Sequence, residues 1–84
     1  MDKIKDFILL WVSNKSGIEI KLVKENINIF EEGYVDSLGA FELISELENK
    51  FLISFSENDF QDRRLVFASV NSLSEVVKDK VDAL

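Results

Sequence analysis

Residues 37–51 read SLGAFELISELENKF and carry the clearest helical pattern of this chain. Apolar residues recur there at intervals of three and four, which is the spacing of one face of an α-helix. This face consists of Leu38, Phe41, Ile44, Leu47 and Phe51, with Leu43 beside it. The opposite side carries Glu42, Glu46 and Glu48. The stretch therefore predicts an amphipathic helix with an acidic outer face.

The residues just before this helix, 29–36, read IFEEGYVD and lead into Asp36-Ser37-Leu38 at its first turn. Ser37 would lie beside free backbone N–H groups and the positive end of the helix dipole, where an attached phosphate is stabilised. We predict that Leu38 anchors the turn in the core and so holds the Ser37 hydroxyl outward. The simpler interpretation is that Asp36 or Ser37 only caps the helix, the commonest role of these residue types there.

A first helix is expected over residues 4–12 and should end near Asn14 and Gly17. Its apolar face consists of Ile4, Phe7, Ile8, Trp11 and Val12. A third, shorter helix is expected to begin at Ser56, whose hydroxyl can cap it.

The last helix should start between Ser69 and Ser72 and run almost to the C-terminus. Ser72 and Glu75 have the spacing of a capping box. The predicted buried stripe of this helix consists of Val70, Leu73, Val77, Val81 and Leu84.

The segment between the first two helices, residues 14–36, is harder to interpret. Apolar and polar residues alternate in 18–22 and 27–29, and also in 52–55, so periodicity alone permits an α+β fold. Each candidate strand is short, and no tight hairpin turn joins them. We therefore favour a long ordered connection, of a length that is often functional.

The composition excludes several kinds of chemistry. The chain has 84 residues, enough for one domain (1–84), and contains no Cys and no His. Disulfides, thiolate nucleophiles, Cys/His zinc sites and imidazole bases are excluded, so we expect no enzymatic activity and no metal site. The longest apolar run is far shorter than a bilayer requires, and the N-terminus lacks a secretory signal. We expect a cytoplasmic monomer without membrane insertion.

The net charge of −6 is concentrated in the middle of the sequence. Residues 25–62 hold ten acidic residues and a single basic one, Lys50. Such a field attracts basic protein surfaces and repels nucleic acid, so no nucleic-acid partner is expected. The alternative is a surface that serves only solubility.

These motifs together resemble the acyl carrier protein family, over essentially the whole chain. The family's modification motif matches Asp36-Ser37-Leu38, and both the preceding FEEG (30–33) and the following Glu42-Leu43 fit its pattern. The resemblance implies that Ser37 receives 4′-phosphopantetheine from coenzyme A, with Asp36 and Leu38 completing the cofactor site. It also implies an all-α four-helix bundle with a long first loop and a short third helix.

The function that the resemblance implies is to carry acyl intermediates as thioesters, in fatty-acid, polyketide or related biosynthesis. Some features depart from fatty-acid carriers: Gly39 stands where an acid usually follows Ser-Leu, Asn49-Lys50 ends the second helix, and no Pro precedes the third. Residues 33–39 and 67–70 look most like discrete carriers that work beside adenylating ligases, such as D-alanyl carriers.

The partners implied are a phosphopantetheinyl transferase and acyl ligases, synthases or transferases with basic docking surfaces. The residues expected to face them are Glu42, Glu46, Glu48, Glu31 and Glu32. The residues expected in the core, parted by a bound acyl chain, are Phe41, Ile44, Leu47, Phe60, Phe67, Val70 and Leu73. Trp11 and Tyr34 are assigned to packing.

Three alternatives to this hypothesis remain. An aminoacyl, D-alanyl or peptidyl carrier would share the arm and load an amino acid. A non-covalent acidic helical module would bind a basic partner without using Ser37. A calcium-binding protein is disfavoured, because the chain lacks the acidic 12-residue loop with a central Gly and a terminal Glu.

Overall fold

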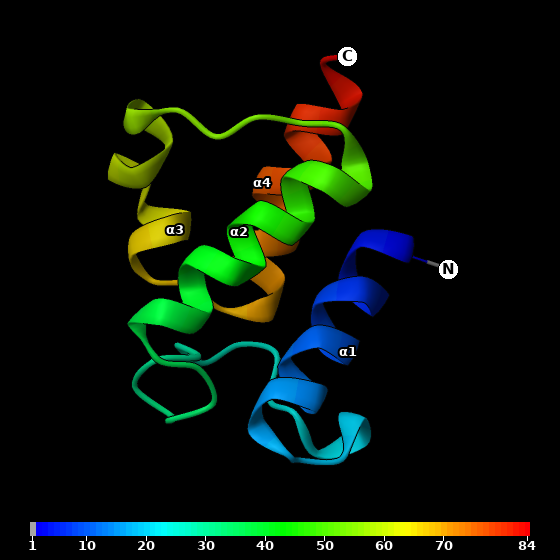
Figure 1. Cartoon of the computed structure of the whole chain (residues 1–84), viewed down its shortest axis with the longest axis vertical. Helices are drawn as coiled ribbons and strands as arrows, with labels where there is room; N and C mark the ends of the chain where they lie inside the picture. The colour runs from blue at the N-terminus through cyan, green and yellow to red at the C-terminus, as the bar shows by residue number, and fades with distance from the viewer. Residues whose placement is uncertain (1) are drawn as a thin grey trace.

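The computed structural model describes residues 2–84, and all of its regular structure there is helical. The α-helices are α1 (Lys3–Ser16), α2 (Ser37–Phe51), α3 (Arg63–Val66) and α4 (Val70–Asp82). Two short 3₁₀ turns, η1 (Ile20–Leu22) and η2 (Glu57–Gln61), lie between them. Three long helices form the bundle and the short α3 lies to one side (Figure 1). The prediction of an all-α fold with a long first loop and a short third helix is confirmed.

Helix α1 is longer than the predicted 4–12. It begins with Asp2, whose carboxylate accepts hydrogen bonds from the Ile4 and Lys5 backbone N–H groups. It continues to Ser16 because the first residue able to stop it is Gly17, which has a left-handed φ of 77°. Asn14 lies inside the helix and does not end it.

Helix α2 has the predicted bounds, but the prediction of its buried face was partly wrong. Leu43 and Leu47 are buried, whereas Leu38 is 74% exposed and Phe41 is 68% exposed. Gly39, Leu43 and Leu47 follow one another at intervals of four, so the buried stripe is centred one residue beyond Leu38. Leu38 therefore does not anchor the helix start in the core.

The third helical region is divided into two pieces. Asp59 accepts a hydrogen bond from the Ser56 backbone N–H at 2.6 Å and so fixes the start of η2 at the predicted residue. At Asp62 the backbone becomes extended, and its carboxylate caps the new helix α3. Phe60 lies within η2 and Phe67 directly follows α3; both are about half exposed, so placing them in the core was wrong.

Helix α4 starts in the predicted window, with a different cap. Ser69 and Ser72 form a reciprocal pair: Ser72 N–H donates to Ser69 Oγ at 3.0 Å, and Ser69 N–H donates to Ser72 Oγ at 2.9 Å. The expected box of Ser72 with Glu75 was wrong, because the helix begins three residues earlier. Leu84 is exposed because the helix ends at Asp82, before the buried stripe can reach it.

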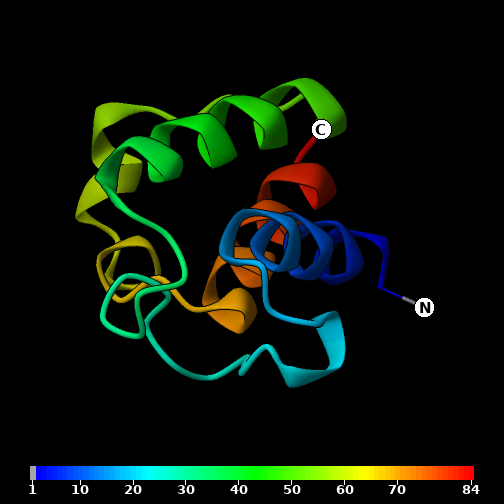
Figure 2. The ribbon, with the colours of Figure 1, turned by 60° about the horizontal axis from the view of Figure 1, so that its bottom comes forward.

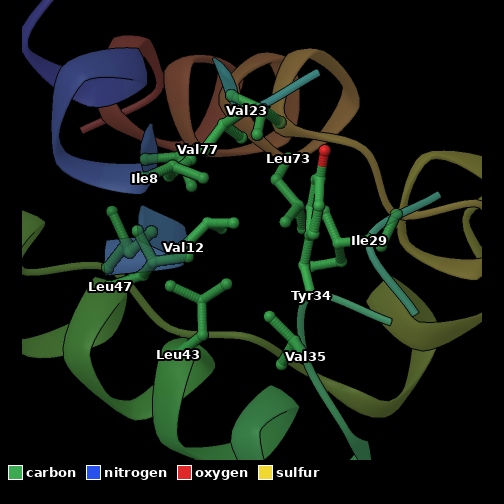
Figure 3. Close-up of a cluster of buried hydrophobic side chains, with 13 residues drawn as sticks. Ile8, Val12, Val23, Ile29, Tyr34, Val35, Leu43, Leu47, Leu73 and Val77 are labelled. Carbon is green, nitrogen blue, oxygen red and sulfur yellow. The ribbon is translucent and has the colours of Figure 1, made fainter. Parts of the chain in front are cut away.

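The connection over residues 17–36 is ordered and packs onto the bundle. It closes one end of the molecule (Figures 1 and 2) and contains no strand, so the alternating residues in 18–22 do not form one. Ile29 N–H donates to the Ala68 carbonyl at 2.9 Å, which ties this loop to the segment before α4. Figure 3 shows loop side chains meeting those of three helices: Ile8, Val12, Val23, Ile29, Tyr34, Val35, Leu43, Leu47, Leu73 and Val77.

Candidate functional site

The start of α2 presents Ser37 to solvent. Ser37 is the first residue of the helix and is exposed. The cap is supplied by Asp36, whose Oδ1 accepts a hydrogen bond from Gly39 N–H at 2.8 Å. The Asp36 carbonyl accepts the first helical bond, from Ala40 N–H at 3.0 Å. The capping role of the motif therefore belongs to Asp36 and leaves the serine hydroxyl available.

The surroundings of this hydroxyl suit a phosphate group. The Ser37 and Leu38 backbone N–H groups precede the first helical hydrogen bond, as the leading N–H groups of any helix do. The aligned peptide dipoles of this 15-residue helix place partial positive charge at the same end. A phosphodiester on Ser37 would thus be fully accessible and would lie where anions are stabilised.

The turn that leads into the site is built by Asn28. Its Oδ1 accepts hydrogen bonds from Phe30 N–H at 2.9 Å and from Glu31 N–H at 3.1 Å. Gly33 follows with a φ of 80°, a conformation that favours glycine. Asn28 was not predicted from the sequence, although an Asn that opens a turn by bonding backbone N–H groups two and three residues ahead is a recognisable signal.

Val35 holds the start of α2 against the body of the protein. It is buried, and a Cβ added to Gly39 would lie 2.7 Å from its Cγ1. The missing side chain of Gly39 therefore permits the close approach of loop and helix. Val35, Asp36 and Gly39 together do what had been assigned to Leu38: they fix the turn so that Ser37 faces outward.

A small apolar cavity lies between α2 and the η2–α3 region. Its volume is about 90 Å³. The lining consists of Ile29, Phe30, Ala40, Leu43, Ile44, Phe60, Leu65, Ala68 and Leu73. Outside it, Leu38 and Phe41 expose apolar surface within about one turn of Ser37. Ile44 and Leu73 were predicted to surround an acyl chain, and the cavity brings both together with Phe60.

Two of the predicted docking glutamates lie on the exposed face of α2, one turn apart, and both contact α1. Glu42 forms an ion pair with Lys15 at 2.8 Å between Oε2 and Nζ. Glu46 accepts a hydrogen bond from the indole N–H of Trp11. The pKa of Lys15 is raised, chiefly by its hydrogen bond to Glu42. Trp11, assigned to packing, therefore also holds a polar contact.

The other three glutamates have different surroundings. Glu48 is half-buried and its Oε2 accepts a hydrogen bond from Phe55 N–H at 2.9 Å, which fastens the chain after α2. Glu32 pairs with Lys24 at 3.3 Å, and Glu31 is exposed in the same turn. The structure thus separates Glu48, which has a structural contact, from the glutamates on the surface.

Two further properties concern metals and membranes. Among residues 2–84, the side chains of Asp and Glu form no group of three or more placed to hold a metal ion. Over the same residues, each helix is too short or too polar to cross a bilayer.

Fold and site together define a small helical bundle that presents one exposed serine at a capped helix start. Residues 9–77 match the family model described as phosphopantetheine attachment site. The chain belongs to this family of phosphopantetheine-binding carrier proteins. It is accordingly a carrier and not a catalyst, and phosphopantetheine is its cofactor.

Similar proteins carry two kinds of name. The acyl carrier protein of Chlamydia muridarum is 32% identical over 72 residues, which cover 86% of this chain and 94% of that protein. The D-alanyl carrier protein of Bacillus subtilis is 44% identical over 59 residues, which cover 66% of this chain and 76% of that protein. D-alanyl carrier protein 1 of Lactiplantibacillus plantarum is 31% identical over 61 residues, which cover 73% of this chain and 75% of that protein.

Proposed function

We propose that residues 1–84 form one acyl carrier domain whose Ser37 hydroxyl is the attachment point of 4′-phosphopantetheine. The observation that carries this proposal is the division of roles at the start of α2, where Asp36 caps the helix and Ser37 is exposed. A hydroxyl engaged in capping would have to be released before it could react. Here the fold requires no hydrogen bond from Ser37 to form its helix start.

The attachment step needs little from the chain itself. Ser37 Oγ forms a bond to the phosphorus of coenzyme A that bears pantetheine, and the bond from that phosphorus to the bridging oxygen breaks. Adenosine 3′,5′-bisphosphate leaves, and the serine proton passes to a base of the phosphopantetheinyl transferase, which also holds the magnesium ion. The attached arm supplies a terminal thiol that carries an acyl group as a thioester. The helix start contributes N–H groups and partial positive charge near the phosphodiester.

The partners in this proposal are the transferase and the acyl ligases, synthases or transferases that load and unload the arm. Their basic surfaces would contact Glu42 and Glu46 on α2. We call these two residues the docking face. Glu31 and Glu32 lie in the turn ahead of the serine and extend the same negative field. Exposed charges of this kind give weak docking that salt screens, which suits a shuttle.

The apolar cavity supports an acyl cargo. Its 90 Å³ corresponds to about three water volumes of roughly 30 Å³ each, enough for the end of a short hydrocarbon chain. All of its lining residues are apolar, so an ammonium group would lose its hydration there without gaining a partner. The exposed Leu38 and Phe41 offer further apolar surface close to the arm.

The proposal is tested by mass spectrometry after incubation with coenzyme A, magnesium and a promiscuous phosphopantetheinyl transferase. The wild type should gain the mass of one phosphopantetheine, and Ser37→Ala should gain none. Ser45→Ala is the matched control, because Ser45 is another exposed serine of α2, and it should be modified like the wild type. Since Asp36 supplies the cap, Ser37→Ala should unfold at the wild-type temperature.

An unmodified wild type, in a reaction that converts a control carrier, would contradict the attachment. The chain would then act as a non-covalent acidic module, and Ser37→Ala would bind its basic partner as well as the wild type does.

A D-alanyl carrier is the second candidate, favoured by the 44% identity to the Bacillus subtilis protein of that name. The two candidates differ in which adenylating ligase loads the arm. Modified chain is therefore offered to ligases for short fatty acids and for D-alanine, and the thioester mass is measured. Loading with D-alanine alone would replace the acyl proposal and leave the attachment at Ser37 intact.

A further inference from the structure

Two side chains of α1 form polar contacts with the two glutamates of the docking face. Lys15 Nζ lies 2.8 Å from Glu42 Oε2, and the Trp11 indole N–H donates to Glu46. Trp11 and Lys15 are one turn apart on α1, and Glu42 and Glu46 are one turn apart on α2. The two helices are thus joined by two parallel polar contacts, which lie in the second and third turns of α2.

Lys15 reaches this position by passing next to Gly39. A Cβ on Gly39 would lie 3.4 Å from Lys15 Cε and 3.3 Å from Asp36 Oδ1, so the lysine stem passes close over the first turn of α2. On its other side the ammonium group lies 5.9 Å from the centre of the Trp11 ring. The hydrogen bond to Glu42 raises the lysine pKa, as expected for an ammonium group that donates to a carboxylate.

Lys15 is placed as a cation from a partner would be placed. Any basic residue that docks on Glu42 meets a carboxylate already neutralised from within the chain. The pair is accessible, since the side chain of Lys15 is 39% exposed and that of Glu42 is 58% exposed. Exposed pairs contribute little to stability and exchange partners readily, so this contact is suited to competition rather than to holding the fold together.

We propose that Lys15 is a specificity-determining residue of the docking face, where it competes with partner cations for Glu42. This inference rests on the proposed function, because it concerns docking at Ser37. Lys15 lowers the affinity for strongly basic partners and so favours those that gain contact elsewhere, for example at the exposed Leu38 and Phe41. Exposed ion pairs of this kind correspond to an affinity change of about two- to fivefold.

The test is the kinetics of Ser37 modification by the transferase, with the carrier as the varied substrate. Lys15→Met keeps the length and apolar stem of the side chain and removes its charge. At low salt the KM for the carrier should fall about two- to fivefold while kcat is unchanged, and the difference should disappear at high salt. Lys5→Met is the matched control, because Lys5 lies on the same helix and pairs with Glu25 at 2.6 Å, away from α2.

A second comparison isolates the pair itself. In a Glu42→Gln chain Lys15 has lost its hydrogen-bond partner and retains only weaker charge interactions with Asp36 and Glu46, so adding Lys15→Met should lower the KM less than it does in the wild type. Lys15→Gln repeats the test with a polar side chain, and thermal unfolding verifies that each variant is folded.

The outcomes separate this inference from the proposed function. An unchanged or higher KM for Lys15→Met, or an equal fall in Lys5→Met or in the Glu42→Gln chain, would overturn the role of Lys15 while Ser37 is still modified. A wild type that is not modified would instead refute the attachment.

Discussion

Gly39 contributes space rather than an unusual backbone conformation. It lies in regular helix, and the position that a Cβ would take is filled by Val35 at 2.7 Å, Asp36 at 3.3 Å and Lys15 at 3.4 Å. The missing side chain thus serves the buried packing of the loop and leaves room for the Asp36 cap of α2, whereas Lys15 lies at ordinary contact distance. The residue marks a departure from fatty-acid carriers at the sequence level, and the structure gives that departure a physical reason.

Gly39→Ala should lower the free energy of unfolding. Crowding against a buried valine costs about 1–3 kcal/mol, whereas replacing glycine by alanine in a helix gains only about 1 kcal/mol. The net loss should be roughly 1 kcal/mol in urea unfolding. In a Val35→Ala background the obstacle is gone, and the same change should stabilise the protein. A stabilising effect of Gly39→Ala in the wild type would contradict this packing.

The start of α2 was predicted correctly from the sequence, and the direction of Leu38 was predicted wrongly. The motif Asp36-Ser37-Leu38 stands at a helix start that the sequence predicts clearly, and the helix begins at Ser37 as predicted. The outward direction of Leu38 did not follow, because an apolar spacing of three and four defines a face only to within about one residue. The contact of Lys15 with Glu42 joins residues 27 apart, and no local pattern reports such a pair.

The η2–α3 region depends on ionic contacts at the scale of the element. Helix α3 has four residues, too few to be stable by itself. Lys80 of α4 pairs with Asp59 at 2.8 Å, and Arg64 bonds both Asp62 and Asp79. These contacts fasten one wall of the apolar cavity to α4, so they also fix where Phe60 and Leu65 lie.

The same contacts make the stability depend on pH. The pKa of Asp59 is lowered, chiefly by its hydrogen bond from Lys80, and that of Asp62 is lowered, chiefly by Arg64. A carboxyl group whose pKa is lower in the folded state stabilises the fold above its unfolded pKa, near 3.8. The contribution is lost as the pH falls through the folded value. Stability should therefore decline on acidification below about pH 4.

Asp59→Asn should reduce the free energy of unfolding at pH 7 by roughly 1 kcal/mol, because Lys80 loses its partner. The decline of stability below pH 4 should become shallower, since one of the responsible carboxyl groups is gone. Urea unfolding over this pH range measures both effects. Asp82→Asn, an equal change at the exposed end of α4, should leave the acid response as it is in the wild type.

Helix boundaries were predictable from the sequence wherever a residue with a strong capping preference stands at the helix end. Helix α2 and the start of α4 follow from serine and aspartate caps, and α1 was cut short because its polar last turn, ending at Ser16, resembles a loop. The break at Asp62 did not follow from the sequence, since the stretch holds neither Gly nor Pro. Its carboxylate caps α3 and pairs with Arg64 two residues ahead, and the further contact of Arg64 with Asp79 of α4, 15 residues away, exists only once the chain has folded.

At the scale of the whole molecule, one core joins the three long helices and the first loop (Figure 3). The loop contributes Val23, Ile29, Tyr34 and Val35, and the Tyr34 hydroxyl accepts a hydrogen bond from Lys24 N–H at 3.2 Å. Residues 18–22 form no strand: Ile18 packs against this core, and the 3₁₀ turn η1 leaves Ile20 and Leu22 exposed. Periodicity leaves the α+β alternative open, because it does not register which distant surfaces a short apolar segment will meet.

Two leucines of α2 provide a matched test of the core. Leu47 is fully buried and Leu38 is 74% exposed. The same Leu→Ala change at both positions therefore separates the effect of burial from that of helix propensity. Leu47→Ala should cost about 2–5 kcal/mol, and Leu38→Ala should change stability by less than about 0.5 kcal/mol. Thermal or urea unfolding decides. Equal losses at the two positions would show that Leu38 has a role in the fold that its exposure conceals.

The cap supplied by Asp36 has a consequence for a population of these molecules. The cap comes from Asp36 and not from residue 37, so unmodified and modified molecules keep the same N-terminal cap on α2. On the proposed function, folding and activation are then separate events in the life of the protein. The modified fraction would depend on the supply of coenzyme A and of the transferase. Proteases and chaperones that recognise unfolded protein would not distinguish unmodified from modified molecules.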